Sequence, residues 1–121
     1  MQFNGLTQVA NAGLDHRAWV VTIVAESGDP TTVYSSALTL SPSRPYRSFL
    51  YRRDTNAPSG VAVAIEGSVN GVQWVNLFTL NDNTEQLWTS PTRMIRFRVT
   101  LPSSPTSSYT VGVVQIVEAT I

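Results

Sequence analysis

Seven prolines divide the chain into short apolar or alternating runs, and this punctuation limits the folds that the chain can adopt. Proline has no backbone N–H for a sheet ladder, so it is confined to turns, edges and strand ends. All seven prolines fall between the runs or at their borders. The expected strands cover residues 18–26, 32–40, 46–53, 60–66, 72–80, 93–101 and 109–119, with a weaker strand at 85–89.

The residue usage favours sheets as well. Valine, isoleucine and threonine supply 34 of the 121 residues, lysine is absent, and glutamate occurs only four times. Branched side chains suit a pleated surface, and no stretch carries the helical spacing of apolar residues. The sequence therefore predicts an all-β fold, an antiparallel, jelly-roll-like β-sandwich of seven or eight strands. No apolar run approaches the ~20 residues that a membrane helix needs.

We expect one domain at residues 18–121, preceded by an N-terminal arm at residues 1–17. The arm is polar and shows no strand pattern of its own. The predicted strands at 18–26 and 109–119 are apolar on both faces, so one face of each remains to be covered after the core is built. Either the arm or a second subunit could cover it. The sequence thus predicts a homo-oligomer, with a trimer as the expected form.

One hairpin has a local signature. Gly67-Ser68-Val69-Asn70-Gly71 separates two expected strands, and an Asn-Gly pair supplies the positive φ angles of a tight turn. Trp74 follows on the second strand. It is interpreted as a core anchor, with a sugar-stacking platform as the alternative.

The arginines are unevenly placed in a chain of zero net charge. Seven of the eight lie in two segments that contain no acid, which predicts a polarised molecule. Arginine binds carboxylates through a planar fork and is common at interfaces beside aromatic residues. We therefore predict a protein-binding role, with a solvated face paired to Asp54 or Glu66 as the alternative. The candidate residues are Arg44, Tyr46, Arg47, Arg52, Arg53, Arg93, Arg96 and Arg98.

Catalytic and metal-binding patterns are weak. The chain has no cysteine, and its single histidine, His16, has no nucleophile motif beside it. Asn81-Asp82-Asn83 with Glu85 offers oxygen ligands but lacks the spacing of a calcium loop, so an Asx-rich turn is the preferred interpretation. We expect no enzyme activity, no cofactor and no metal. Zero net charge also argues against nucleic acid as a partner.

Residues 61–80, VAVAIEGSVNGVQWVNLFTL, resemble a pattern of small virion proteins of tailed bacteriophages: an alternating strand, Glu-Gly-Ser, an Asn-Gly turn, a tryptophan and a second strand. They are also similar to a hairpin of discoidin-type, galactose-binding-like sandwiches, although this chain is shorter and has no cysteines. The phage resemblance implies a capsid decoration or cement protein on the outer capsid surface, often trimeric, whose partner is the major capsid protein. The alternatives are a phage tail or adaptor component and a carbohydrate-binding module.

Overall fold

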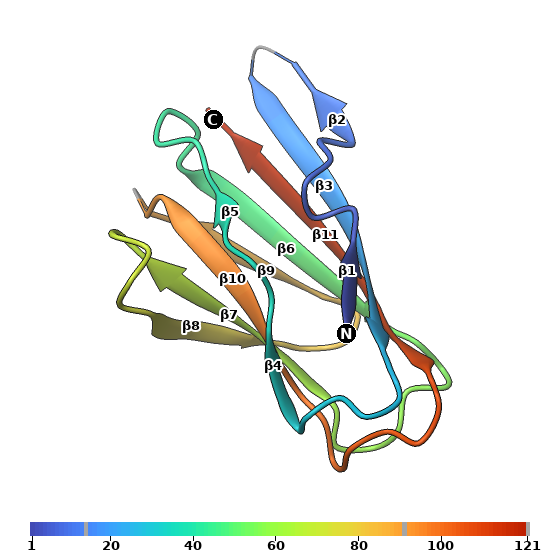
Figure 1. Ribbon diagram of the computed structural model, residues 1–121. Helices are drawn as coiled ribbons and strands as arrows, with labels where there is room; N and C mark the ends of the chain where they lie inside the picture. The colour runs from blue at the N-terminus through green and yellow to red at the C-terminus, as the bar shows by residue number, and fades with distance from the viewer. Residues whose placement is uncertain (14, 91, 121) are drawn as a thin grey trace.

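The computed structural model describes residues 1–13, 15–90 and 92–120, and these form eleven strands and no helix (Figure 1). The described part therefore has no helix that could cross a membrane. The strands are β1 (Gln2–Asn4), β2 (Asn11–Ala12), β3 (His16–Ala25), β4 (Thr32–Tyr34), β5 (Leu38–Thr39), β6 (Tyr46–Arg53), β7 (Ala62–Ser68), β8 (Val75–Leu80), β9 (Thr84–Thr89), β10 (Met94–Thr100) and β11 (Tyr109–Ala119).

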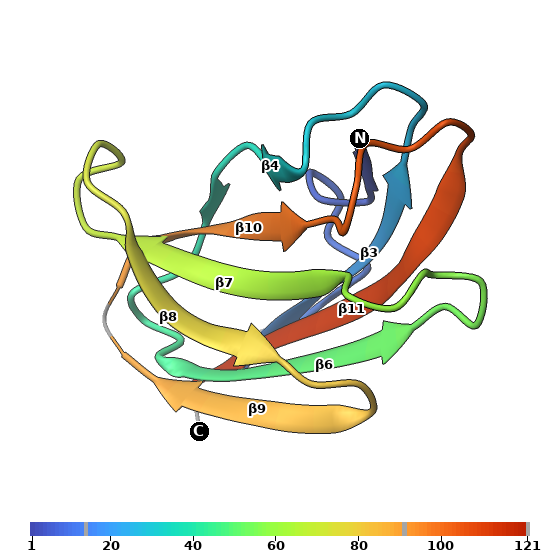
Figure 2. The ribbon, with the colours of Figure 1, turned by 90° about the horizontal axis from the view of Figure 1, so that it is seen from below.

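The strands form two antiparallel sheets, which confirms the predicted β-sandwich. The first sheet, sheet A, has the order β1-β3-β11-β6-β9, and β2 also pairs with β3. The second, sheet B, has the order β4-β10-β7-β8, and β5 also pairs with β10. The chain crosses between the sheets several times. One crossing is the turn from β8, at the edge of sheet B, to β9, at the edge of sheet A (Figure 2).

The prediction of seven or eight strands is too low for two physical reasons. The expected strand 32–40 is split, because the Ser35 hydroxyl takes the place of a backbone acceptor and receives the Phe97 N–H at 2.9 Å. The remaining two strands, β1 and β2, lie in the segment for which no strand was predicted. Strands of two or three residues are too short to show an alternating pattern.

The N-terminal segment packs on the sandwich through β1, β2 and Leu6. β1 pairs with β3 at the edge of sheet A, and the Phe3 ring stacks on Phe97 of sheet B at 6.0 Å. Leu6 is buried in the core. The accessible surface is 6388 Å², close to the ~6,400 Å² of a compact monomer of this mass. In the described part, residues 1–13 therefore lie against the domain rather than extending from it.

Aromatic side chains join the two sheets in the core. Phe49 of sheet A meets Phe78 of sheet B edge to face at 5.3 Å, and Trp88 packs against both rings. In β10 the alternation predicted from the sequence is confirmed, since Ile95, Phe97 and Val99 are buried while the arginines between them face outward. The inward faces of both sheets thus form one core.

The predicted hairpin is present as β7 and β8, with a longer loop than an Asn-Gly turn requires. Residues 69–74 form the loop, and only Gly71 takes a positive φ, of 76°. Side chains hold the loop in shape: Ser68 Oγ accepts the Gly71 N–H at 2.8 Å, and Asn70 Oδ1 accepts the Gln73 N–H at 3.0 Å. Asn70 therefore stabilises the loop through a hydrogen bond of its side chain, and not through a positive φ angle of its backbone.

Candidate protein-binding surfaces

The outer face of sheet B carries a group that we call the arginine–aromatic stack: Tyr34, Glu66, Trp74, Arg96 and Arg98. Arg96 lies over the rings of Tyr34, at 4.2 Å, and Trp74, at 4.4 Å. Trp74, interpreted from the sequence as a core anchor, is therefore a partner of Arg96 on the outer face instead. The Arg96 Nε donates to Glu66 Oε1 at 2.8 Å. Arg96 and Glu66 are direct partners across β10 and β7, so the sheet register itself brings these charges together.

Arg98 is held less tightly within the same stack. Its Nη1 donates to Glu66 Oε2 at 3.3 Å and its Nη2 to Asn76 Oδ1 at 3.4 Å, both near the limit of a hydrogen bond. Its side chain is 32% exposed, against 24% for Arg96. The stack holds two guanidinium groups and one carboxylate, so it keeps a surplus positive charge. The pairing with Glu66 that the sequence offered as the alternative is thus present, together with residual exposure of both arginines.

Arg47 has a different environment from the one predicted. Its side chain is fully buried and points into the core, where it donates to the backbone carbonyls of Ser41, at 3.1 Å, and Ser90. Its guanidinium also lies 5.3 Å from the Trp88 ring. Burial lowers the pKa of Arg47, while the nearby Glu118 carboxylate opposes this shift. The guanidinium of Arg47 is therefore buried and does not join the exposed arginines.

Glu118 is the buried acid of this region. It accepts from the Arg17 guanidinium and from the Ser41 N–H at 3.0 Å, and its Oε2 lies 3.9 Å from Arg47 Nε. Arg17 also packs over the Trp19 ring at 5.0 Å. These contacts tie the chain between β5 and β6 to sheet A, so this cluster has a structural role.

The other predicted interface residues are dispersed. Arg53 donates to the carbonyls of Ala57 and Pro58, and Arg44 donates to Ser41 Oγ and to the Gly13 carbonyl. Arg52 and Arg93 are exposed at different parts of the chain, and Tyr46 is 48% exposed on the outer face of sheet A. The first arginine segment therefore does not form one surface, whereas Arg96 and Arg98 share the face that the alternation predicts.

A second candidate surface is the outer face of sheet A, which we call the sheet A face. Apolar side chains remain exposed on it: Val20 at 43%, Val117 at 38% and Leu87 at 69%. A shallow hollow of about 170 Å³ lies on this face, and its lining residues are Tyr46, Arg47, Ser48, Leu87, Val117 and Ala119. The two-sided apolarity of β3 and β11 in the sequence is therefore an exposed apolar surface in the folded chain.

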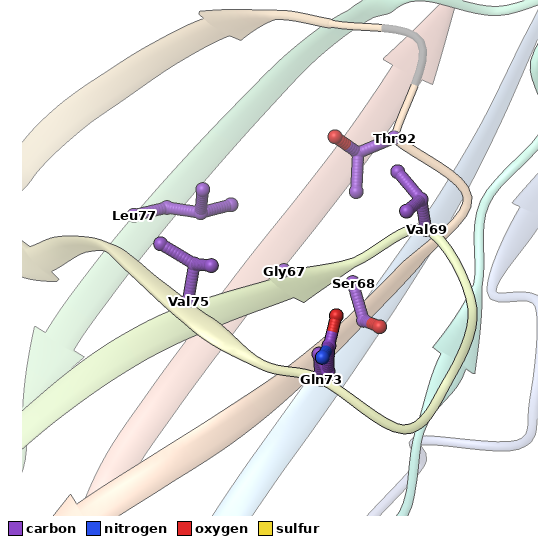
Figure 3. Close-up of a pocket in the computed structure, with 7 residues that line it drawn as sticks. All are labelled: Gly67, Ser68, Val69, Gln73, Val75, Leu77 and Thr92. Atoms are coloured by element: carbon purple, nitrogen blue, oxygen red, sulfur yellow. The ribbon is translucent and has the colours of Figure 1, made fainter.

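A larger hollow of about 340 Å³ opens at the β7–β8 hairpin (Figure 3). Its lining combines apolar groups with three uncharged polar side chains and has no acid or base. The lining residues are Gly67, Ser68, Val69, Gln73, Val75, Leu77 and Thr92. Such a lining gives no anchor for a charged substrate.

The described residues hold no group of three or more acidic or histidine side chains that could bind a metal ion. Asp82 lies between β8 and β9, and its Oδ1 accepts the N–H of Arg53, at the end of β6, at 2.8 Å.

Among known proteins, the similarity that we report is to a solved structure. No protein-family model matches the chain, and no curated protein matches it. A solved structure titled "Crystal Structure of FLHE" is similar with a TM-score of 0.49 and 15% sequence identity. The match covers 86% of this chain and 96% of that chain.

Two features of these surfaces were not predicted from the sequence. Glu118 was not identified as the acid of a buried cluster, since a glutamate in an apolar strand carries no local sign of its partners. Arg47 was not separated from the exposed arginines, although it has the same parity as the buried Phe49 and Tyr51. Its position in the alternation of β6 was therefore the signal in the sequence that could have predicted its burial.

Proposed function

We propose that the chain is a non-enzymatic structural protein of a phage particle, a decoration or cement protein that binds the assembled major capsid protein lattice on the outer capsid surface. The arginine–aromatic stack carries this proposal, together with the resemblance of residues 61–80 to small virion proteins. A protein of this kind needs a stiff scaffold and a recognition surface, and it needs no reactive group.

The stack is suited to protein recognition because its central arginine is already ordered. Two rings and one carboxylate hold Arg96 in place, so little side-chain freedom remains to be lost on binding. Arg98 makes longer hydrogen bonds within the stack than Arg96 does, and its side chain is more exposed. It is therefore the donor that a carboxylate of the partner would bind. The surplus positive charge of the stack matches an acidic or carbonyl-rich surface.

Capsid-binding titration of the double variant Arg96→Ala/Arg98→Ala tests the proposal. At a desolvated interface the loss of a paired arginine costs about 2–5 kcal/mol of binding free energy. Arg52→Ala is the matched control, because Arg52 is exposed on the opposite sheet. We expect wild type to bind expanded capsids and to ignore free subunits. Wild-type affinity in the folded Arg96/Arg98 variant would reject the stack as the docking surface, and binding to tails alone would favour the tail alternative.

The carbohydrate alternative requires exposed, coplanar aromatic side chains. Trp19 is buried, Trp88 packs into the core, and Trp74 stacks on Arg96. The two exposed tyrosines, Tyr34 and Tyr46, belong to different sheets. No observation on the described residues favours a sugar platform, so we propose no glycan ligand.

A further inference from the structure

We propose that the sheet A face is a self-association surface on which two copies of this chain pack face to face about a twofold axis. The proposal is independent of the capsid role, because it concerns the opposite sheet and needs no other protein.

The N-terminal segment leaves this face open. β1 and β2 pair with the edge of β3, and Leu6 is buried in the core. Val20, Val117 and Leu87 nevertheless keep 38–69% of their surface exposed. The sequence suggests that either the N-terminal arm or a second subunit covers the outer apolar side chains of β3 and β11. The arm does not cover them on this face. A second copy of the chain is the other candidate to cover this face.

The face is nearly free of charge. Its outward side chains come from alternate positions of four strands: Ala18, Val20, Thr22 and Val24 of β3, Val113, Gln115, Val117 and Ala119 of β11, Tyr46, Ser48, Leu50 and Arg52 of β6, and Glu85, Leu87 and Thr89 of β9. Among these described residues, Arg52 and Glu85 are the charged ones, and both lie toward the Arg53 end of β6. A sheet face that stays in water normally carries polar side chains in alternation. The opposite face, on sheet B, does carry Glu66, Arg96 and Arg98.

A twofold rotation makes one row of this face complementary to itself. One row across the strands reads Ala18, Val117, Ser48, Leu87, because these residues are successive partners in the pairings of β3, β11, β6 and β9. A twofold axis along the strands, between β11 and β6, reverses this row in the second copy. Leu87 then lies opposite Ala18, and Val117 lies opposite Ser48. Large side chains meet small ones, as interdigitated sheet faces require.

The area fits a weak but specific contact. Four strand positions at ~4.8 Å and seven residues at ~3.3 Å give a face of ~19 by ~23 Å, or ~440 Å² in projection for each copy. Two copies together bury ~900 Å² by this measure, close to the ~1,000 Å² lower limit of specific interfaces. Self-association is therefore expected at high rather than low concentration. A twofold contact builds a dimer in place of the trimer that the sequence predicts, and closed twofold pairs are the commonest oligomers.

Sedimentation of the purified chain, without any capsid component, tests the proposal. We expect the mass to rise from 13.2 kDa toward twice that value between micromolar and millimolar concentration. Leu87→Arg should weaken self-association about tenfold or more. Val72→Arg is the matched control, because Val72 is 80% exposed in the β7–β8 loop of sheet B, and this variant should dimerise as wild type does.

A size swap tests the register. Ala18→Leu should weaken the dimer, because a leucine then meets Leu87, and Ala18→Leu/Leu87→Ala should restore it. A wild-type monomer at millimolar concentration, a trimer, or a Leu87→Arg variant that dimerises normally would overturn the twofold face. A folded double variant that fails to recover would overturn the pairing of Leu87 with Ala18. Each result stands apart from the capsid titration, so failure of one proposal leaves the other testable.

Discussion

Glu66 on β7 and Arg96 on β10 are direct cross-strand partners, and the arginine Nε donates to the carboxylate at 2.8 Å. This pair organises the outer face of sheet B, since Glu66 also accepts from Arg98. Both arginines come from a segment without any acid, and their partner is supplied by the neighbouring strand. Pairing across the sheet thus fixes their geometry while part of each guanidinium stays exposed.

Removal of the central carboxylate should destabilise the fold. In Glu66→Gln the two arginines lose their acid, and we expect a loss of about 1–3 kcal/mol in the free energy of unfolding. Chemical denaturation measures this loss. Glu85→Gln, at an exposed position on β9, is the control and should change stability by less than about 0.5 kcal/mol. Equal stability of the two variants would mean that the Glu66 contacts contribute nothing net.

Two arginines of the same segment should differ sharply. Arg47→Met removes a buried charge that caps two backbone carbonyls, and we expect a loss of about 3 kcal/mol or more. Arg52→Met changes an exposed side chain and should cost less than about 0.5 kcal/mol. Thermal and chemical unfolding of both variants checks this contrast. A comparable effect of the two substitutions would argue against the buried position of Arg47.

The hairpin loop depends on Gly71. Its φ of 76° disfavours a β-branched side chain, and a Cβ there would lie 3.1 Å from the Met94 sulfur. Gly71→Val should therefore lower stability by about 1–3 kcal/mol. Gly71→Asn is the control and should lose less, because asparagine tolerates positive φ. Equal unfolding midpoints for the two variants would contradict the loop geometry.

Stability should depend on pH through the N-terminus in a chain that begins at Met1. The Met1 ammonium donates to Asp29 at 2.8 Å and lies 2.9 Å from Glu26 Oε1. The bond to Asp29 raises the pKa of this amino group above its ordinary 8.0. Burial alone would raise the pKa of Asp29, but its bonds to the ammonium and to the Glu26 N–H hold that pKa below its ordinary 3.8.

The amino group stabilises the fold below pH 8.0, and this contribution disappears as the pH rises through the raised pKa. The carboxylate stabilises the fold above pH 3.8, and this contribution disappears as the pH falls through the lowered pKa. The melting temperature of wild type should exceed that of Asp29→Asn most between these limits, with a smaller difference in strong base and strong acid. Asp15→Asn, an exposed control, should track wild type throughout. A constant difference across the pH range would exclude the ion pair as its source.

The all-β class, most of the strand segments and the inward faces could be predicted from the amino-acid order alone, because a strand alternates its side chains with a period of two residues. Ile95, Phe97 and Val99 are buried, and Arg96 and Arg98 face outward, as this period requires. The same rule predicted apolar outer positions on β3 and β11.

Which charges meet, and which surfaces stay open, depends on how the strands are ordered in the folded chain. The burial of Arg47 rests on carbonyls of Ser41 and Ser90 and on Glu118, and the order of Arg96 rests on Glu66 and two rings from other segments. β1 and β2 exist because β3 offers them an edge to pair with. Such partners are distant in the chain, so no local pattern encodes them, and they become neighbours only when the sheet order is set.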